Sequence, residues 1–273
     1  MALIRRFTIC LLVMASASAQ AQSLVTIDVK PARSADLQSR RVRVFPNGDL
    51  VATSVNAITL IDEGYSVPAN PSSRLSTLPP WVYSERYDIA AKAAPVAKRS
   101  GSSDNGTKMV KVEFRQVLAD RFKLKMRVEN KWVPVYALLI ASGGLKLKRA
   151  KLTNCVFDDA PDGCHNFVIG FGHPLNARAI DLDDLAHYIE NWTDLPVVNK
   201  TAITGLFTVN TPGWRPMRLP PPPNGSGTVD FTQLPSIGAV LRPLGLELRK
   251  QEATVPIYTV EHIEPPSTYQ PRN

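Results

Sequence analysis

The stretch that decides the fold is Val117-Leu-Ala-Asp-Arg-Phe122-Lys-Leu-Lys-Met-Arg-Val128, followed shortly by Val133-Pro-Val-Tyr136-Ala-Leu. A second copy of this pattern lies about 120 residues further on, as Val240-Leu-Arg-Pro-Leu-Gly245-Leu-Glu-Leu-Arg-Lys250 followed by Val255-Pro-Ile-Tyr258-Thr-Val. The two copies align with a gap of a single residue. Because a repeat at one spacing indicates a duplicated structural unit, the sequence predicts two halves of the same kind.

Each copy of this repeat has the residue alternation of a β-strand. From Phe122 to Glu129, apolar residues at every second position are separated by charged ones. A period of two is typical of a strand with one buried and one solvent-facing side. Residues 129–132 are then expected to form a turn into a second strand over residues 133–141. The second copy is expected to repeat this hairpin, with strands over residues 246–250 and 255–263.

Helices are expected to alternate with these strands in both halves. Apolar residues at positions 182, 185, 186 and 189 form the stripe of an amphipathic helix. Asp181 suits its N-cap position, and Asp183 and Asp184 suit the positive start of a helix. Further helices are expected around residues 57–64, 110–118 and 237–244, and Pro243 should shorten the last of these.

This order of elements predicts an α+β fold, in which two duplicated β-α-β-(β)-α-β-β units pack their helices on small mixed sheets. We place the first unit at residues 22–150 and the second at residues 151–265. A Pro- and Gly-rich insertion at residues 211–235 interrupts the second unit, and residues 266–273 are expected to be a disordered tail. A chain of this length can bury enough apolar surface to fold without a metal ion.

The N-terminus has the pattern of a secretory signal peptide over residues 1–21. Arg5 and Arg6 precede an apolar run over residues 7–15, and small residues follow, with Ala19 and Ala21 as alternative cleavage positions. The apolar run is too short for a membrane span, which needs about 20 residues. We therefore expect an exported protein, periplasmic or secreted, that does not span the membrane.

Removal of the signal peptide would also remove Cys10 and leave two cysteines, Cys155 and Cys164. An isolated pair in an oxidising compartment most often forms a disulfide, and the turn-rich residues between these two favour closure. A zinc site formed by Cys155, Cys164, His165 and His173 is a more specific alternative, and two free thiols are the third possibility. The adjacent positions of Cys164 and His165 are awkward for one tetrahedral ion. We therefore predict a disulfide and no metal ion or other cofactor.

The chain is basic, with 32 Lys and Arg residues against 24 Asp and Glu residues and a net charge of +8. Some of the basic residues gather along the predicted strands of the first half: Lys123, Lys125, Arg127, Lys146 and Lys148. The simplest interpretation is a solvated charged face. The alternative is a surface for an anionic envelope polymer or an acidic partner, with binding that weakens as salt rises. Export and the scarcity of interleaved aromatic residues argue against a nucleic-acid partner.

Several stretches together resemble a family of exported proteins of soil bacteria that has no known function. In the first half they are Trp81-Val-Tyr-Ser-Glu-Arg-Tyr-Asp-Ile-Ala-Ala-Lys92, Leu118-Ala-Asp-Arg-Phe-Lys-Leu-Lys125, Pro134-Val-Tyr-Ala-Leu138 and Gly143-Gly-Leu-Lys-Leu-Lys148. In the second half they are Leu195-Pro-Val-Val-Asn-Lys-Thr-Ala-Ile-Thr-Gly205-Leu-Phe207 and Val260-Glu-His-Ile-Glu-Pro265. The resemblance spans most of the chain and transfers no catalytic residue.

The stretch from Leu182 to Ile263 is also similar to the short N-terminal domain of secretins and TonB-dependent transducers. That small periplasmic fold sandwiches two helices between little sheets, so the resemblance implies a module that binds another protein. The insertion at residues 211–235 departs from its pattern and puts the usual partner-facing surface in doubt.

The sequence offers little to support catalysis. It contains no Gly-x-Ser-x-Gly elbow and no phosphate loop. His187 and His262 are expected to be structural, and the carboxylates at positions 181, 183 and 184 are explained by helix capping. We therefore predict a non-catalytic envelope module that recognises a protein, a peptide or a small ligand. The alternative is an envelope hydrolase or other enzyme whose site is built from loops 142–181 and 211–235.

Overall fold

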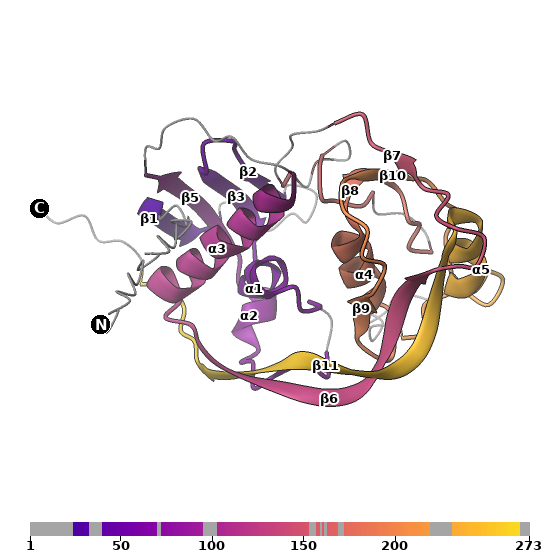
Figure 1. Cartoon of the computed structure of the whole chain (residues 1–273). Helices are drawn as coiled ribbons and strands as arrows, with labels where there is room; N and C mark the ends of the chain where they lie inside the picture. The colour runs from indigo at the N-terminus through magenta and orange to yellow at the C-terminus, as the bar shows by residue number, and fades with distance from the viewer. Residues whose placement is uncertain are drawn as a thin grey trace, which may run out of the picture.

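The computed structural model describes residues 24–32, 40–69, 72–94, 103–152, 157–158, 160, 163–168, 172–218 and 231–267. These residues form an α+β fold with three small sheets, which confirms the predicted fold class (Figure 1). One sheet lies wholly within the first predicted unit, and another joins residues 148–149 at the end of that unit to two strands of the second. The third is shared by both halves and runs beneath them.

The elements follow one another in an order that alternates strands and helices. They are β1 (Leu24–Pro31), β2 (Arg41–Val44), β3 (Leu50–Val55), α1 (Ala57–Tyr65), β4 (Leu75–Ser76), α2 (Trp81–Ser84), β5 (Tyr87–Ala93), α3 (Ser103–Arg121), β6 (Lys125–Ile140), β7 (Lys148–Arg149), β8 (Ala177–Ile180), α4 (Leu182–Glu190), β9 (Val197–Asn199), β10 (Phe207–Val209), α5 (Ile237–Leu241), a 3-10 turn (Arg242–Leu244) and β11 (Leu246–His262).

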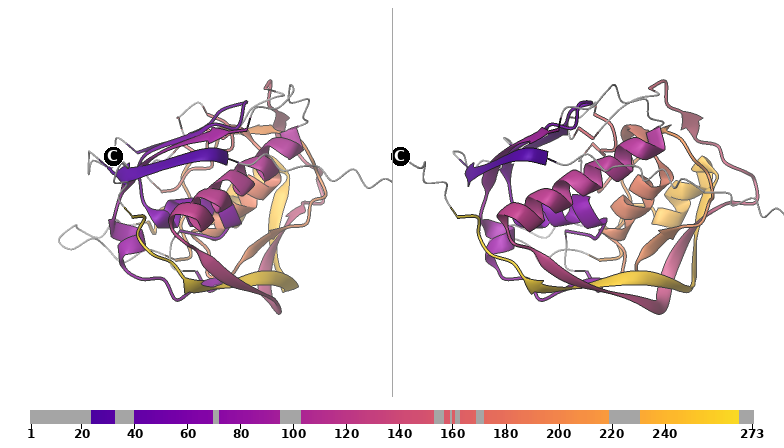
Figure 2. Two further views of the ribbon diagram at one scale, coloured as in Figure 1. Left: turned by 90° about the vertical axis from the view of Figure 1, so that its left-hand side faces the viewer. Right: turned by 60° about the vertical axis from the view of Figure 1, so that its left-hand side comes forward.

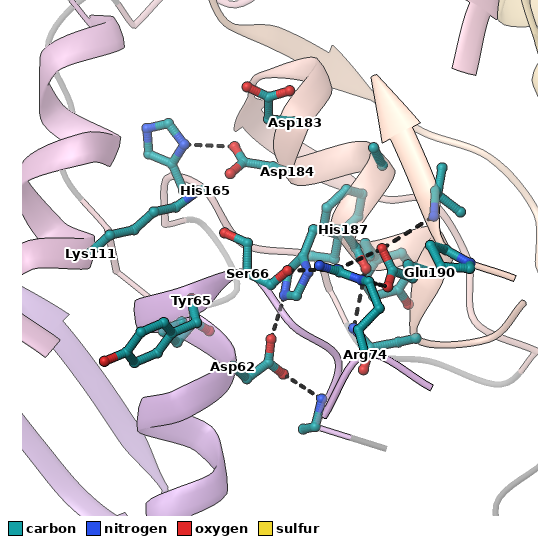
Figure 3. Close-up of a pocket in the computed structure, with 18 of the residues that line it drawn as sticks. Asp62, Tyr65, Ser66, Arg74, Lys111, His165, Asp183, Asp184, His187 and Glu190 are labelled. Atoms are coloured by element: carbon teal, nitrogen blue, oxygen red, sulfur yellow. Dashed lines mark hydrogen bonds and ion pairs between the residues drawn. The ribbon is translucent and has the colours of Figure 1, made fainter. Parts of the chain in front are cut away.

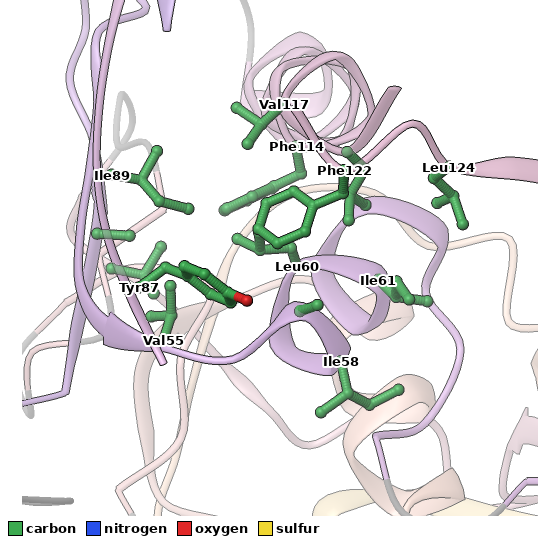
Figure 4. Close-up of a cluster of buried hydrophobic side chains, with 14 of the residues drawn as sticks. Val55, Ile58, Leu60, Ile61, Tyr87, Ile89, Phe114, Val117, Phe122 and Leu124 are labelled. Atoms are coloured by element: carbon green, nitrogen blue, oxygen red, sulfur yellow. The ribbon is translucent and has the colours of Figure 1, made fainter. Parts of the chain in front are cut away.

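The first half packs α1 and α3 against an antiparallel sheet of order β1-β5-β3-β2. Figure 4 shows how Leu60 from α1 and Phe114 from α3 meet side chains of the sheet in one fully buried cluster. Gly64 does not end α1 as predicted but lies in its last turn. A Cβ atom there would sit 3.3 Å from the Cβ of Phe114, so this glycine allows α1 and α3 to pack closely.

The second half places α4 and α5 beside a small sheet of order β7-β10-β8. Asp181 caps α4 as predicted, in a reciprocal box in which the Asp181 side chain accepts from the backbone N–H of Asp184 and the Asp184 side chain accepts from that of Asp181. The predicted effect of Pro243 is also confirmed. The α-helical turns of α5 end at Leu241, and the chain continues as a 3-10 turn because proline has no N–H for the next α-helical bond.

The predicted hairpins within each half are wrong. Residues 129–132 lie inside the continuous strand β6, and residues 251–254 lie inside the continuous strand β11. The two strands pair antiparallel with each other along nearly their whole length, from Ile140 opposite Leu246 to Lys125 opposite His262. They form a long curved ribbon under both halves (Figures 1 and 2). We call this pair of strands the ribbon.

The reason for the error is that the segment predicted to turn carries neither Gly nor Pro and can remain extended. Trp132, at its end, lies directly opposite Thr254 in the ribbon, and both side chains are exposed. On the other side of the ribbon, Val135, Ala253 and Val255 form a small buried cluster. A polar segment therefore continues as strand because only one face of the ribbon is buried there.

Several pairings of elements recur in both halves of the chain. The residue before the N-cap of α1, Val55, pairs with Tyr87, and the residue before the N-cap of α4, Ile180, pairs with Phe207. The shared sheet has the order β4-β11-β6-β9, in which each short outer strand runs parallel to its neighbour. The short strands pair with the two tyrosines that occupy matching repeat positions, β4 with Tyr258 and β9 with Tyr136.

Several predicted features lie outside the described residues: the signal peptide, Cys155, residues 219–230 of the insertion and residues 268–273 of the tail. The predicted disulfide therefore stays a prediction, and Cys164 is buried against Ala179 and Leu206. Among the helices that the structure describes, none is both long and apolar enough to cross a membrane.

The ribbon can be tested by disulfide trapping. Residues directly opposite on antiparallel strands have Cβ atoms about 5 Å apart, close to what a disulfide requires. We expect the double variant Trp132→Cys with Thr254→Cys to form a new disulfide on mild oxidation, detected by peptide mass spectrometry. Val128→Cys with Thr254→Cys, four positions out of register, is the matched control and should stay reduced. Equal trapping in both, or none in either, would favour separate hairpins.

Candidate functional site

A cavity of about 720 Å³ lies between the two halves, above the ribbon. One wall comes from α1 and the segment after it, and the opposite wall comes from α4 and the segment that leads to β9. The floor includes Thr254, Val255 and Pro256 at the middle of the ribbon. Because both halves and the ribbon contribute, the cavity depends on the complete fold.

The first contact across the cavity joins α1 to α4. The side chains of Asp62 and His187 are hydrogen-bonded through Oδ1 and Nε2 (Figure 3). The two residues occupy matching positions, since each follows the N-cap of its helix by six residues. Burial alone would lower the pKa of His187, but Asp62 and the neighbouring carboxylates outweigh this and raise it. The other oxygen of Asp62 accepts from the backbone N–H of Ala69 at 3.2 Å.

The second contact across the cavity is a buried ion pair between Arg74 and Glu190. Nε and Nη2 of Arg74 donate to the two carboxylate oxygens of Glu190 at 2.6 and 2.9 Å, and the side chains are only 8% and 5% exposed. Arg74 also donates to the carbonyl oxygen of Ser66, and Glu190 also accepts from the backbone N–H of Val197. These additional bonds satisfy both charges, as a buried pair requires.

A third histidine–carboxylate pair lies at the start of α4. Nδ1 of His165 is 2.6 Å from Oδ2 of Asp184, the same oxygen that completes the capping box. Burial opposes ionisation of both groups, yet their mutual attraction raises the pKa of His165 and lowers that of Asp184. Burial and the nearby Asp184 raise the pKa of Asp181 to about 7.

The ligand-type atoms of His165, Asp181 and Asp184 all lie within 4.8 Å of one another, the spacing of a metal site. Their geometry is accounted for by the capping box and by the His165–Asp184 bond, which already occupy these oxygens and Nδ1. The cluster therefore does not need a metal ion to explain it. The zinc alternative that includes Cys155 falls partly outside the described residues.

Three charged side chains on the cavity have no such partner. Among the described residues, Glu63, Arg40 and Lys111 line the cavity without making a hydrogen bond or an ion pair. Burial, reinforced by the neighbouring Asp62, raises the pKa of Glu63 to about 8. Glu63 is therefore mostly protonated at neutral pH and can donate a hydrogen bond, whereas the arginine and the lysine carry their positive charges into the cavity.

Aromatic rings form another part of the wall. Tyr188 stacks on Phe167 with ring centroids 4.1 Å apart, and Trp192 stacks on His173 at 3.7 Å. Burial raises the pKa of Tyr188 to about 12 and lowers that of His173, so both rings are uncharged at neutral pH. The cavity thus combines flat apolar surfaces with a few charged groups, as small-molecule sites commonly do.

The basic residues predicted as a binding surface lie elsewhere. Lys123, Lys125, Arg127, Lys146 and Lys148 are all exposed, and none of them lines the cavity. Arg127 forms ion pairs with Glu129 and Glu261, and Lys123 donates to the carbonyl oxygen of Asp120. These contacts reduce the positive field of that face, and its role as an anionic-partner surface stays a prediction.

Sequence reasoning missed most of the cavity. Asp62 and Glu63 carried no distinctive signal, since two adjacent acids on an amphipathic helix can both face solvent. Arg74 and Arg40 lie outside helices and carried no signal. His187 was expected to be structural, and it does hold the two helices together, but its position on the cavity wall was not foreseen.

The fold and the cavity together define an α+β protein whose two halves enclose a cavity with apolar surfaces and charged groups. Residues 58–263 match the protein family DUF3738, which is described as a protein family of unknown function. Because the match covers about three quarters of the chain, the chain belongs to this family. The matched region begins within α1 and ends just after β11, so it includes both main walls and the floor of the cavity. No curated protein and no solved structure matches the chain.

Arg74 and Glu190 should stabilise the folded state strongly only when both side chains are present. We expect Arg74→Met and Glu190→Gln each to lower the free energy of unfolding by about 3–5 kcal/mol, because each leaves a buried polar group without its partner. The double variant Arg74→Met with Glu190→Leu should cost less than the sum of the single changes. Urea unfolding measures all three. Arg127→Met, which breaks a surface pair, is the control and should cost about 0–1 kcal/mol.

Glu63 should make stability fall as the pH rises. Its pKa in the folded state is raised, so between its ordinary value near 4.5 and about 8 the folded protein retains a proton that the unfolded chain releases. Relative to Glu63→Gln, the wild type should therefore lose about 2 kcal/mol of stability between pH 6 and pH 8. Urea unfolding at the two pH values checks this. Glu252→Gln removes an exposed carboxylate outside the cavity and should follow the wild type. Parallel pH profiles for the wild type and Glu63→Gln would contradict the expectation.

Proposed function

We propose that the protein is an exported, non-catalytic binding protein of the bacterial envelope that holds a small ligand or short peptide in the cavity between its halves. The observation that supports this most directly is the cavity itself, since its volume of about 720 Å³ is in the range of small-molecule sites. Its walls carry stacked aromatic rings together with unpaired charged side chains. A purely structural junction would gain nothing from leaving such groups without partners.

The state of the histidines supports binding rather than catalysis. His187 uses Nε2 for Asp62, and its Nδ1 is buried without a hydrogen-bond partner among the described residues. A general base must reach the proton that it removes, and this nitrogen is closed off from the cavity. The Arg74–Glu190 and His165–Asp184 pairs are likewise occupied in holding elements together.

A hydrolase or other enzyme is the second candidate. Two histidine–carboxylate pairs face one cavity, an arrangement that general acid–base catalysis also uses. The walls, however, come mainly from α1 and α4. Residues 142–181 supply only a part of them, and the described residues of 211–235 supply none. A reaction product in the binding screen described below would favour this candidate.

Export rests on the N-terminal pattern of residues 1–21, and we retain it as part of the proposal, with a periplasmic or secreted location in a soil bacterium. A partner protein or peptide of the envelope, or an anionic polymer, would then be the natural source of the ligand. The duplication also belongs to the proposal. Its support is the matching order of strands and helices and the equivalent pairings of Tyr136 and Tyr258 with β9 and β4.

The proposed function is tested by a thermal-shift screen of a chemically mixed small-molecule and tripeptide set against the mature chain. At least one compound should raise the melting temperature, because a ligand that binds only the folded state stabilises it by mass action. Trp192→Ala, which removes a ring from the aromatic wall, should weaken the binding of that compound at least tenfold. Trp132→Ala is the matched control, since it removes an exposed tryptophan outside the cavity. Stabilising compounds that bind both variants equally would place the site elsewhere and contradict the proposal.

A further inference from the structure

The side of β6 that faces away from β11 is open over much of its length. β11 pairs with one side of β6 along nearly the whole strand, but β9 pairs with the other side only at residues 136–138. Between Lys125, where β6 begins, and Val135, no strand among the described residues pairs with that other side. Figure 1 shows the middle of β6 along the lower rim of the molecule. We call this side of residues 125–135 the open edge.

Backbone groups point outward from the open edge at alternate residues. Tyr136 donates its backbone N–H at 2.8 Å to the segment that leads into β9, so even-numbered residues turn their N–H and C=O groups away from β11. The register with β11 has no shift between residues 126 and 140, so this alternation continues through the open edge. Pro134 agrees with it, because proline fits only where the ladder requires no N–H. Asn130 and its even-numbered neighbours therefore offer hydrogen-bonding groups that no described strand uses.

Two large apolar side chains are exposed on this edge. Val128 and Trp132 lie two residues before and two residues after Asn130, on one face of the ribbon, and they are 52% and 69% exposed. Among the described residues, Trp132 is the most exposed of the large hydrophobic side chains. An open edge that also carries exposed apolar groups is a template on which another extended chain can pair.

A second copy of β6 fits this edge when the two strands run antiparallel about Asn130. Asn130 is the midpoint of the open edge, so a two-fold axis there lets each copy pair over all of residues 125–135 and stop where the pairing with β9 begins at Tyr136. In this register, Val128 of each copy lies opposite Trp132 of the other. A β-branched side chain opposite an aromatic one stabilises antiparallel strands.

The charges on the other face favour the same register. Glu129 of each copy lies opposite Lys131 of the other, so an acid meets a base on both sides of the axis. Within one chain these two side chains already form an ion pair at 3.1 Å and are about half-exposed, so a second copy can reach them. Moving the axis by one residue would place two glutamates or two lysines opposite each other. Moving it by two residues would leave part of the open edge unpaired.

We propose that the open edge is the interface of a two-fold symmetric homodimer, in which two β6 strands pair antiparallel about Asn130. The pairing joins the shared sheets of two copies and covers Val128 and Trp132 in both. Charged side chains ordinarily keep a strand edge from pairing with other chains. Here Glu129 and Lys131 select a second copy in one register. The interface goes beyond the proposed function and does not depend on it, because none of residues 125–135 lines the cavity.

Exchange of charges tests the interface. Glu129→Lys and Lys131→Glu each place like charges opposite one another in the homodimer, so each should weaken self-association at least tenfold. An equimolar mixture of the two variants brings opposite charges together again and should form a heterodimer. Sedimentation velocity of the mature chain over a concentration series measures the masses, and the wild type should reach twice the mass of one chain. Lys148→Glu makes the same change of charge on an exposed residue outside the open edge and should associate like the wild type.

Cysteine variants test the register. A mixture of Glu129→Cys and Lys131→Cys chains should form a disulfide between the two chains on mild oxidation, because directly opposite residues of this kind are close to disulfide geometry. Either variant alone should form much less of a disulfide through its new cysteine, since identical residues then lie diagonally across the axis, about 7–8 Å apart. Peptide mass spectrometry identifies the linked residues.

Two outcomes would overturn the inference. A wild type that remains monomeric over the whole concentration series has no such interface. A dimer that Glu129→Lys and Lys131→Glu leave as tight as the wild type uses another surface. Restored association in the mixture excludes misfolding of the single variants as the cause of their weakness, so loss in each variant with recovery in the mixture supports the proposed pairing.

Discussion

The antiparallel pairing of β6 with β11 is the interaction on which the rest of the structure depends. It joins strands that come from different halves of the chain, and it forms the centre of the four-stranded sheet that lies under both halves. The ribbon also provides the cavity floor through Thr254, Val255 and Pro256. Without it, α1 and α4 would have no fixed separation, and the contact between Asp62 and His187 could not form.

Above the ribbon, the two halves are joined by charged contacts rather than by a continuous apolar core. The two main apolar clusters are separate: one surrounds Phe114 and includes Tyr258 and Val260 of β11, and the other surrounds Trp214 and includes Leu138 of β6. Between them stand the Arg74–Glu190 and Asp62–His187 pairs. Ion pairs hold the interface in register without filling it, so a cavity with both apolar and charged lining remains between the clusters.

The sequence predicted local structure well and long-range pairing poorly. The period of apolar residues located α4, and the chemistry of Asp181 and Pro243 correctly predicted its cap and the end of α5. The strand residues were also recognised, but their partners were not, because alternation shows which face is buried and not which strand lies alongside. The same limit hid the cavity. Glu190 and Arg74 are more than one hundred residues apart, and neither carries a local pattern that points to the other.

The position of β11 at the end of the described chain has a consequence for how the molecule is made. Each ribbon pair joins residues more than one hundred positions apart, so closing it requires a large loss of chain entropy before any contact compensates for it. Such topologies fold slowly. Until β11 has emerged and paired, the long edge of β6 is available to any other extended chain, including another copy. The last strand that the structure describes is therefore also the one that protects this edge of β6 from pairing with other chains.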